Sequence, residues 1–258
     1  MSTQVALVTG AASGMGRIFA VRMAKRGVQV AGLDRDAQTL EATARDRDGL
    51  HAYQCDVSDL ASIEAVTARV IDDLGTIDRA VHCAAIMPAA RLVDQDVAQI
   101  HQLMTVNYGG TVNLTKTVLP HMIRRGKGEL VLFGSMGGFV LVPECGAYCA
   151  SKAAINAFAE VLIEEVRGSG VRVMLVCPPL VDTPLLQQAL ATSNPKSIRD
   201  SIATQRLADP ERMIDEVEAG LARGTEILLP GVEAKLLMWA RRLAPRLLWK
   251  IILRSNRE

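Results

Sequence analysis

The sequence predicts an α/β fold in which helices cover both faces of a mainly parallel β-sheet. Seven short runs rich in Val, Leu and Ile alternate with longer segments of helical periodicity. The runs are continuously apolar, as expected for strands buried on both faces. Alternating strands and helices favour parallel pairing through right-handed crossovers, which gives a doubly wound sheet. With 258 residues, 49% of them hydrophobic, the chain is long enough for one large core.

The elements follow from local patterns along the chain. A first helix is expected to end at Gly27, and a later one to begin at the N-cap residue Asp59 and end at Gly75. The segment 148–166 also has the pattern of a helix. The predicted strands cover residues 5–10, 28–34, 51–57, 77–85, 129–135, 171–178 and 226–231.

Charge and cysteine content exclude several functional classes. The formal net charge is +1, so no global attraction to nucleic acid is expected. The five cysteines include no C-x-x-C pair and no His–Cys cluster of zinc spacing, which predicts no metal site. The first residues lack the pattern of a secretory signal, and no uncharged run reaches the ~18 apolar residues of a transmembrane helix. These features predict a cytoplasmic location.

A glycine cluster follows the first predicted strand. The stretch TGAASGMGR places Gly10, Gly14 and Gly16 where the strand turns into a helix. Glycine permits a tight turn there and lets backbone N–H groups approach a pyrophosphate, while the helix adds the positive end of its dipole. A purely structural turn would also use glycines. The position between the first strand and a helix therefore carries the prediction of a dinucleotide site.

Residues at the ends of the second and third predicted strands indicate which dinucleotide binds. Asp34 ends the second predicted strand, where a carboxylate can accept hydrogen bonds from an adenosine ribose and repel a 2′-phosphate. Arg35 follows directly and offers a guanidinium that can pair with a 2′-phosphate. Asp56 and Val57 close the third strand, where a carboxylate can meet the adenine amino group. We expect NAD, with NADP as the less favoured alternative.

A tyrosine and a lysine stand one helical turn apart in the stretch AYCASK. On a helix Tyr148 and Lys152 share a face, and a nearby ammonium favours the phenolate form of tyrosine. Such a pair can exchange a proton with an alcohol or a carbonyl oxygen. Ser135 ends the fifth predicted strand, at the edge where open α/β sheets hold ligands. Its hydroxyl can bind the same substrate oxygen.

Together these motifs resemble those of the short-chain dehydrogenase/reductase family. The resemblance spans about residues 4–231 and rests on motifs in the order and spacing of that family. They are TGAASGMG, Asp56-Val57, VNYGG, Ser135, YCASK and CPPLVDT. The resemblance implies a single Rossmann-like catalytic domain over residues 1–232 and a homo-oligomer, a homotetramer or a homodimer.

The resemblance also implies roles for individual residues. Tyr148 would be the acid/base, Ser135 the partner of the substrate oxygen, and Lys152 would lower the pKa of the tyrosine and bind the nicotinamide ribose. Asn107 would hold a water that relays protons from Lys152, and Thr183 would contact the carboxamide. The cofactor-binding residues would be Gly10, Ser13, Gly14, Met15, Gly16, Asp34, Arg35, Asp56, Val57, Cys83, Ala84, Ala85, Tyr148, Lys152, Pro178, Val181 and Thr183.

The sequence departs from the family pattern in three places, one of which is Ala85, whose methyl group beside the expected cofactor ribose is expected to cost some affinity. Residues 82–85 read HCAA where the family usually has N-N-A-G, and Cys83 cannot supply the amide hydrogen bonds of an asparagine. We interpret this as a change in how the strand end is supported. Pro179 replaces the usual glycine and is expected to stiffen the loop over the nicotinamide.

The substrate side is predicted to be apolar. Residues 184–209 should form a loop or short helices over the active site. The predicted pocket residues are Met136, Val142, Leu185 and Leu186. They favour a small lipophilic ketone or secondary alcohol of steroid, terpenoid, alicyclic or acyl-chain type, although apolar residues are equally typical of an ordinary core. Arg91, Lys196 and Arg199 leave open a carboxylate contact.

Three functional classes fit these observations. The leading one is an NAD-dependent alcohol dehydrogenase or ketone reductase, with an NADP-dependent carbonyl reductase as its variant. The second is a non-catalytic dinucleotide-binding protein on the same fold, because fold does not fix function. The third is another enzyme on this scaffold, such as an epimerase or a dehydratase.

Residues 233–258 form a basic, amphipathic extension beyond the common core of the family. The extension is predicted to be helical, with a kink at Pro245, and it carries both tryptophans, Trp239 and Trp249. We expect the helix to dock near the substrate entrance or at a subunit contact. Peripheral contact with an anionic membrane is the less favoured alternative.

Overall fold

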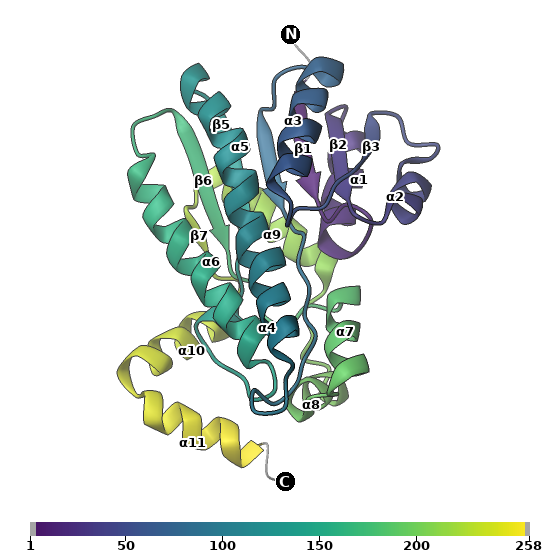
Figure 1. The fold of residues 1–258 in the computed structure, drawn as a ribbon. Helices are drawn as coiled ribbons and strands as arrows, with labels where there is room; N and C mark the ends of the chain where they lie inside the picture. Colours follow the sequence, from purple (N-terminus) through teal and green to yellow (C-terminus); the bar gives the residue numbers. More distant parts are fainter. Residues whose placement is uncertain (1–3, 256–258) are drawn as a thin grey trace.

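The sheet has the predicted doubly wound, Rossmann-like topology (Figure 1). The computed structural model describes residues 4–255. Its seven strands are ordered β3-β2-β1-β4-β5-β6-β7, and all six pairings are parallel, so the sheet is fully rather than mainly parallel. The strands are β1 (Val5–Thr9), β2 (Gln29–Asp34), β3 (Leu50–Gln54), β4 (Arg79–His82), β5 (Gly128–Phe133), β6 (Val171–Val176) and β7 (Ile227–Leu228).

The helices divide between the two faces of this sheet. One core contains side chains of α3, α5 and α6, such as Ile63, Leu114 and Ala159. The other contains side chains of α1 and α9, such as Phe19 and Val217. The helical segments are α1 (Gly14–Lys25), α2 (Ala37–Ala44), α3 (Leu60–Leu74), α4 (Val97–Leu103), η1 (Met104–Gly109), α5 (Gly110–Arg125), η2 (Met136–Gly138), α6 (Gly146–Glu165), α7 (Pro184–Thr192), α8 (Lys196–Ala203), α9 (Pro210–Arg223), α10 (Val232–Leu243) and α11 (Pro245–Ser255).

The strand pattern follows from burial on both faces. All five residues of β1 are buried, and they pair with β2 on one side and β4 on the other. A central strand without a solvent face has no reason to alternate polar and apolar residues. Because every strand runs in the same direction, all carboxyl ends meet at one edge of the sheet, where ligands bind in such folds.

Two pairs of helices lie outside the layers at that edge. The segment predicted to cover the site contains α7 and α8 (Figure 1). The C-terminal extension contains α10 and α11, which meet at Pro245, as the predicted kink requires. Ala244 leaves the helical conformation with φ −137° and ψ 57°, because proline disfavours a helical residue before it. No helix among residues 4–255 is long and apolar enough to cross a membrane.

Candidate active site

The glycine-rich loop forms a cradle of backbone between β1 and α1. Gly10 and Gly14 have φ values of +69° and +53°, which favour glycine. A Cβ at Gly16 would lie 2.2 Å from the carbonyl oxygen of Gly10, so no larger residue fits there without a shift. The loop lines a cavity of about 310 Å³ at the N-terminus of α1. Narrow, glycine-lined space at a helix N-terminus fits the pyrophosphate of a dinucleotide.

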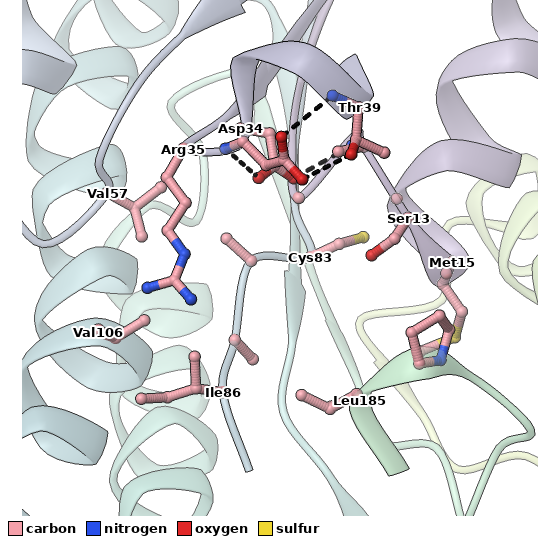
Figure 2. A pocket seen from close by; sticks show the side chains of 18 of the residues that line it. Ser13, Met15, Asp34, Arg35, Thr39, Val57, Cys83, Ile86, Val106 and Leu185 are labelled. Carbon is pink, nitrogen blue, oxygen red and sulfur yellow. Dashed lines mark hydrogen bonds between the residues drawn. The ribbon is translucent and has the colours of Figure 1, made fainter. Parts of the chain in front are cut away.

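Asp34 holds this loop as well as facing the cavity. Its Oδ2 accepts a hydrogen bond of 3.1 Å from the backbone N–H of Ala12, and its Oδ1 accepts one of 3.1 Å from Asp36. Figure 2 shows the Arg35 side chain extending from beside Asp34 toward Val106 and Ile86, which also line the cavity. Both groups that bear on the choice between NAD and NADP therefore line the same cavity.

Most of the predicted cofactor residues line this cavity of about 310 Å³, called the smaller cavity below. It also contains residues that no sequence pattern indicated, since their positions depend on how loops cross the sheet edge. The predicted residues in its wall are Gly10, Ser13, Gly14, Met15, Gly16, Asp34, Arg35, Asp56, Val57, Cys83, Ala84, Ala85 and Thr183. The residues that sequence reasoning missed are Ala12, Asp36, Thr39, Cys55, Ile86, Val106, Pro184 and Gln188.

A histidine supports the strand end at which the family usually has asparagine. His82 Nδ1 lies 2.8 Å from Thr9 Oγ1, and that oxygen accepts a 3.2 Å hydrogen bond from the N–H of Ala84. Burial lowers the pKa of His82 to about 3, so the imidazole is neutral at pH 7. Burial also raises the pKa of the neighbouring Cys83 to about 12, which keeps the thiol protonated. The His82–Thr9 pair therefore links β4 to β1 without an amide side chain.

Ser135 is fixed at the carboxyl end of β5 by a residue that the sequence reasoning missed. Asn156 on α6 accepts a 3.3 Å hydrogen bond from the Ser135 N–H and donates one of 3.1 Å to the Ser135 carbonyl. The Ser135 hydroxyl oxygen accepts a hydrogen bond of 2.9 Å from the N–H of Gly137. The buried amide of Asn156 thus sets the backbone from which the Ser135 hydroxyl projects.

Tyr148 and Lys152 lie together on α6, as the spacing predicted. The Lys152 ammonium is 5.8 Å from the centre of the Tyr148 ring and donates a 2.8 Å hydrogen bond to the carbonyl of Phe133. Burial lowers the pKa of Lys152 to about 8. Burial also raises the pKa of Tyr148, while its interaction with the Ser135 hydroxyl lowers it. The expectation of a lowered tyrosine pKa is corrected here, because burial is the largest effect on this group.

Asn107 lies behind the site in a π-helical turn, η1. Its Nδ2 donates hydrogen bonds of 3.0 Å to the Ile86 carbonyl and to Ser151 Oγ, and its Oδ1 accepts one of 2.8 Å from the Ile86 N–H. Ser151 in turn donates a 2.8 Å hydrogen bond to the carbonyl of Tyr148. The side chain of Asn107 thus braces the turn of α6 that carries Tyr148. A role for Asn107 in holding a water stays a prediction.

A second cavity of about 690 Å³ adjoins the first and contains the remaining predicted site residues except Asn107, which lines neither cavity. Met15, Cys83, Ala85, Thr183 and Leu185 line both cavities, so the two spaces meet. The predicted catalytic and substrate residues in the larger wall are Ser135, Met136, Val142, Tyr148, Lys152, Leu185 and Leu186, together with the predicted cofactor contacts Pro178 and Val181. The polar residues that sequence reasoning missed are Ser197, Ser201, Arg206 and Glu216.

Among the described residues, no cluster of three or more His, Cys, Asp or Glu side chains has the arrangement of a metal site. The four polar residues on α8, α9 and their connection add hydrogen-bonding groups to a mainly apolar cavity wall that also holds Ser135, Tyr148 and Lys152. Arg91 and Arg199, which the sequence left open as carboxylate contacts, are not among the residues that line it; neither is Lys196.

Comparison with known proteins places this arrangement in a family. The family model for short chain dehydrogenases matches residues 4–194. The chain is a short-chain dehydrogenase/reductase. It is 32% identical over 249 residues to 2-(R)-hydroxypropyl-CoM dehydrogenase of Xanthobacter autotrophicus, with 89% of this chain and 98% of that protein covered. It is 31% identical to D-threitol dehydrogenase of Mycolicibacterium smegmatis, with 88% and 92% covered.

Solved structures of this dehydrogenase/reductase family have the same fold. The chain matches a 3-ketoacyl-(acyl-carrier-protein) reductase from Brucella melitensis complexed with NADH, with a TM-score of 0.76, 27% identity and coverage of 84% of this chain and 90% of that one. A short-chain dehydrogenase/reductase from Burkholderia phymatum in complex with NAD matches with a TM-score of 0.83, covers 95% of both chains and is 22% identical. The second match supports the fold alone.

Proposed function

We propose that this oxidoreductase interconverts a secondary alcohol and a ketone with NAD(H). The observation that carries the proposal is the placement of Ser135, Tyr148 and Lys152 in one wall of the larger cavity, directly beside the glycine-lined one. The relatives named above as dehydrogenases of hydroxypropyl-CoM and threitol act on alcohols by their names, which supports the same reaction class.

The side chains divide the proton chemistry between them. In ketone reduction, the protonated Tyr148 donates its proton to the carbonyl oxygen, and its raised pKa keeps the proton available at pH 7. Ser135 donates a hydrogen bond to the same oxygen and stabilises the charge that develops on it. In the opposite direction the phenolate of Tyr148 accepts the proton of the alcohol, and Lys152, which is charged at pH 7, favours that phenolate form.

The chain's residues fit a nicotinamide dinucleotide, which supplies the hydride donor or acceptor. Gly10, Gly14 and Gly16 would hold its pyrophosphate against the N-terminus of α1. We infer NAD rather than NADP because Asp34 is held at the cavity wall by two backbone N–H groups, where a 2′-phosphate would meet a fixed negative charge. Arg35 in the same wall supports NADP as the alternative.

The larger cavity supports a lipophilic substrate. Its wall combines Met87, Met136, Val142 and Leu186 with a few polar side chains at α8 and α9. An apolar cavity with a small number of placed polar groups is typical of sites for small molecules. A steroid, terpenoid, alicyclic or acyl-chain compound with one secondary alcohol or ketone has the matching chemistry. We infer in addition a homo-oligomer, a tetramer or a dimer, on the family resemblance.

The test is turnover with a graded substrate panel. Purified protein would be mixed with NAD or NADP and secondary alcohols of increasing apolar size, and with the reduced cofactors and the matching ketones, while nicotinamide absorbance is followed. We expect turnover with NAD that improves with apolar size. Binding of NAD without turnover on any member would favour a non-catalytic dinucleotide-binding protein, and better kcat/KM with NADP would reverse the cofactor assignment.

A further inference from the structure

The C-terminal arm, defined here as α10 and α11, presents an apolar stripe to solvent. Leu236, Trp239 and Leu243 are 63%, 54% and 76% exposed. Their spacing of three and seven residues places them on one face of α10. On the opposite face Ala234 is buried and Met238 packs against the core of the sheet. The predicted docking of this helix thus accounts for one face and leaves the other uncovered by the described part of the chain.

Basic side chains border the exposed stripe. Lys235 lies four residues before Trp239 and Arg242 three residues after it, so both are neighbours of the tryptophan on the helix surface, and both are exposed. In α11, Leu247 is exposed between Arg246 and Lys250, which are exposed as well. None of these four cations forms an ion pair with a described carboxylate. After Glu233 the sequence has seven Lys or Arg residues and one acidic residue, Glu258.

We propose that this arm binds the surface of an anionic phospholipid membrane. Leucine and tryptophan on one face with Lys and Arg along its border are the composition of helices that lie in a membrane interface. The indole ring suits that depth because it combines a large apolar body with one polar N–H group. Anionic lipid headgroups complement the uncompensated positive charge of the arm.

A second copy of the chain fits this surface less well. A two-fold dimer contact brings the same patch of each subunit together. Here that would place Lys235 and Arg242 of each copy opposite the basic border of the other, and like charges in contact are unfavourable. A lipid surface carries the opposite charge and has no such conflict.

The arm lies beside the larger cavity. Ala234 and Leu237 of α10 line that cavity, while Leu236 and Trp239 face outward. Figure 1 shows both helices of the arm at the same end of the molecule as α7 and α8, away from the amino end of β1. Membrane binding would therefore bring the wall of the substrate cavity next to the lipid.

Sedimentation with vesicles tests the proposal without any enzymatic readout. The full-length protein would be mixed with vesicles of phosphatidylcholine alone or with about 30% phosphatidylglycerol, at low and high salt. We expect binding to the anionic vesicles that weakens as salt is added, because each basic residue near the surface contributes roughly fivefold in partition. A protein that stays in the supernatant with both vesicle types would overturn the proposal.

Two variants with matched controls separate the apolar and the basic contributions. The triple variant Leu236→Ser, Trp239→Ser and Leu243→Ser should reduce vesicle binding at least about tenfold, whereas Ile123→Ser, an exposed residue at the far end of α5, should not. The double variant Lys235→Glu and Arg242→Glu should also reduce vesicle binding. Its control, Lys116→Glu with Lys127→Glu, makes an equal charge change elsewhere on the surface and should leave vesicle binding unchanged.

Sizing of the same proteins decides between lipid and self-association. Since the substituted side chains of α10 are exposed, we expect unchanged thermal melting and an unchanged oligomeric state. If the triple variant instead dissociates the native oligomer, the stripe is a subunit contact, and the proposal fails. Equal loss of binding in the control variants would also overturn it, because the arm would then have no special role.

Discussion

The two adjoining cavities are built from different parts of the chain. The smaller one is formed around a glycine-rich turn, the carboxyl ends of β1 to β3 and the N-terminus of α1. The larger one is made by side chains from segments far apart in sequence, including η2, α6, α8, α9 and α10. The glycine turn of the first tolerates few residue types, whereas the specificity of the second can change through single side-chain substitutions.

This difference has a physical basis. A turn with positive φ at Gly10 and no space for a Cβ at Gly16 constrains the local sequence tightly. An apolar wall constrains only size and polarity, because many side chains satisfy it. We therefore expect substitutions in the smaller cavity to act on cofactor affinity, and those in the larger cavity, which also holds the catalytic residues, to act on substrate binding and turnover.

The largest effect should come from Tyr148→Phe, in the wall of the larger cavity. The variant keeps the ring and removes the exchangeable proton, so kcat should fall by ~10²-fold to 10⁴-fold. NAD affinity, measured by fluorescence titration, should change less than about twofold, since general acid–base chemistry rather than binding is removed. Tyr108→Phe on η1 is the control. Near-normal turnover of Tyr148→Phe would remove this residue from the acid/base role.

Lys152→Met should abolish most activity and yet stabilise the protein at pH 7. Burial lowers the pKa of Lys152 from 10.5 to about 8, so the folded state holds an unfavourable charge at pH 7. Removing this charge should raise the free energy of unfolding by about 1–3 kcal/mol, a net value that includes the loss of the hydrogen bond to the Phe133 carbonyl.

The pH dependence of stability provides the check. Between pH 8 and 10.5 the unfolded chain keeps the proton on Lys152 that the folded chain releases, so this residue's contribution to native stability rises with pH. Melting curves of native protein and Lys152→Met should thus converge toward pH 10.5. Lys116→Met, at an exposed position, should show no such convergence. A less stable Lys152→Met at pH 7 would contradict the expectation.

Gly16→Ala should weaken NAD binding by at least about tenfold. The new methyl group would lie 2.2 Å from the Gly10 carbonyl oxygen, so the turn that holds the pyrophosphate must shift. Calorimetric titration with NAD measures the effect. In Gly109→Ala the added methyl meets no atom closer than 3.8 Å, and affinity should stay the same. Equal affinity in Gly16→Ala and native protein would show that the loop is not the pyrophosphate site.

Asp34→Ala should narrow the preference for NAD over NADP by up to about tenfold. The substitution removes a carboxylate that repels a 2′-phosphate and can accept a ribose hydrogen bond. The ratio of kcat/KM for the two cofactors is the measurement. Asp34→Asn, which keeps the shape and loses the charge, separates repulsion from support of the loop through Ala12. If the native enzyme already prefers NADP, Arg35 outweighs Asp34.

The smallest effect belongs to the C-terminal arm. Leu237→Ala removes apolar surface from the wall of the larger cavity and should raise KM for a large substrate about fourfold, with kcat and NAD affinity unchanged. Leu236→Ala, the neighbouring residue that faces outward, is the matched control. Identical KM values for the two variants would show that the arm does not contact substrate.

The predicted cofactor residues of the smaller cavity and the Tyr–Lys pair of the larger one could be found from the sequence because the patterns behind them are local. Glycine spacing, a carboxylate at a strand end and a Tyr–Lys pair on one helix face each follow from rules that act over a few residues. All seven strands were found for the same reason, with the ends of some, such as β4, shorter than the apolar runs suggested. The parallel order of the sheet followed from the alternation of elements.

The features that the sequence did not predict depend on contacts between distant segments of the chain. No local pattern links Asn156 to Ser135 across 21 residues, or His82 to Thr9 across 73. The pKa of Tyr148 could not be inferred from its spacing to Lys152, since the depth of burial decides it. The exposed stripe of the arm could not be predicted for the same reason. Periodicity predicts an amphipathic helix but does not say which face packs against the protein.

Cysteines in the wall of the larger cavity make the site accessible to covalent labelling. Cys145 is the N-cap residue of α6 and Cys149 lies in the first turn of that helix; both line the cavity, on either side of Tyr148 in the sequence. Burial raises the pKa of Cys145 to about 12, so water-soluble alkylating reagents should react slowly with its protonated thiol. A lipophilic electrophile that occupies the cavity would be held beside both sulfur atoms. Peptide mass mapping would then identify which cysteine is modified and so where the electrophile binds. Unreactive ligands that slow this labelling would be ranked by their affinity for the cavity before any substrate is known.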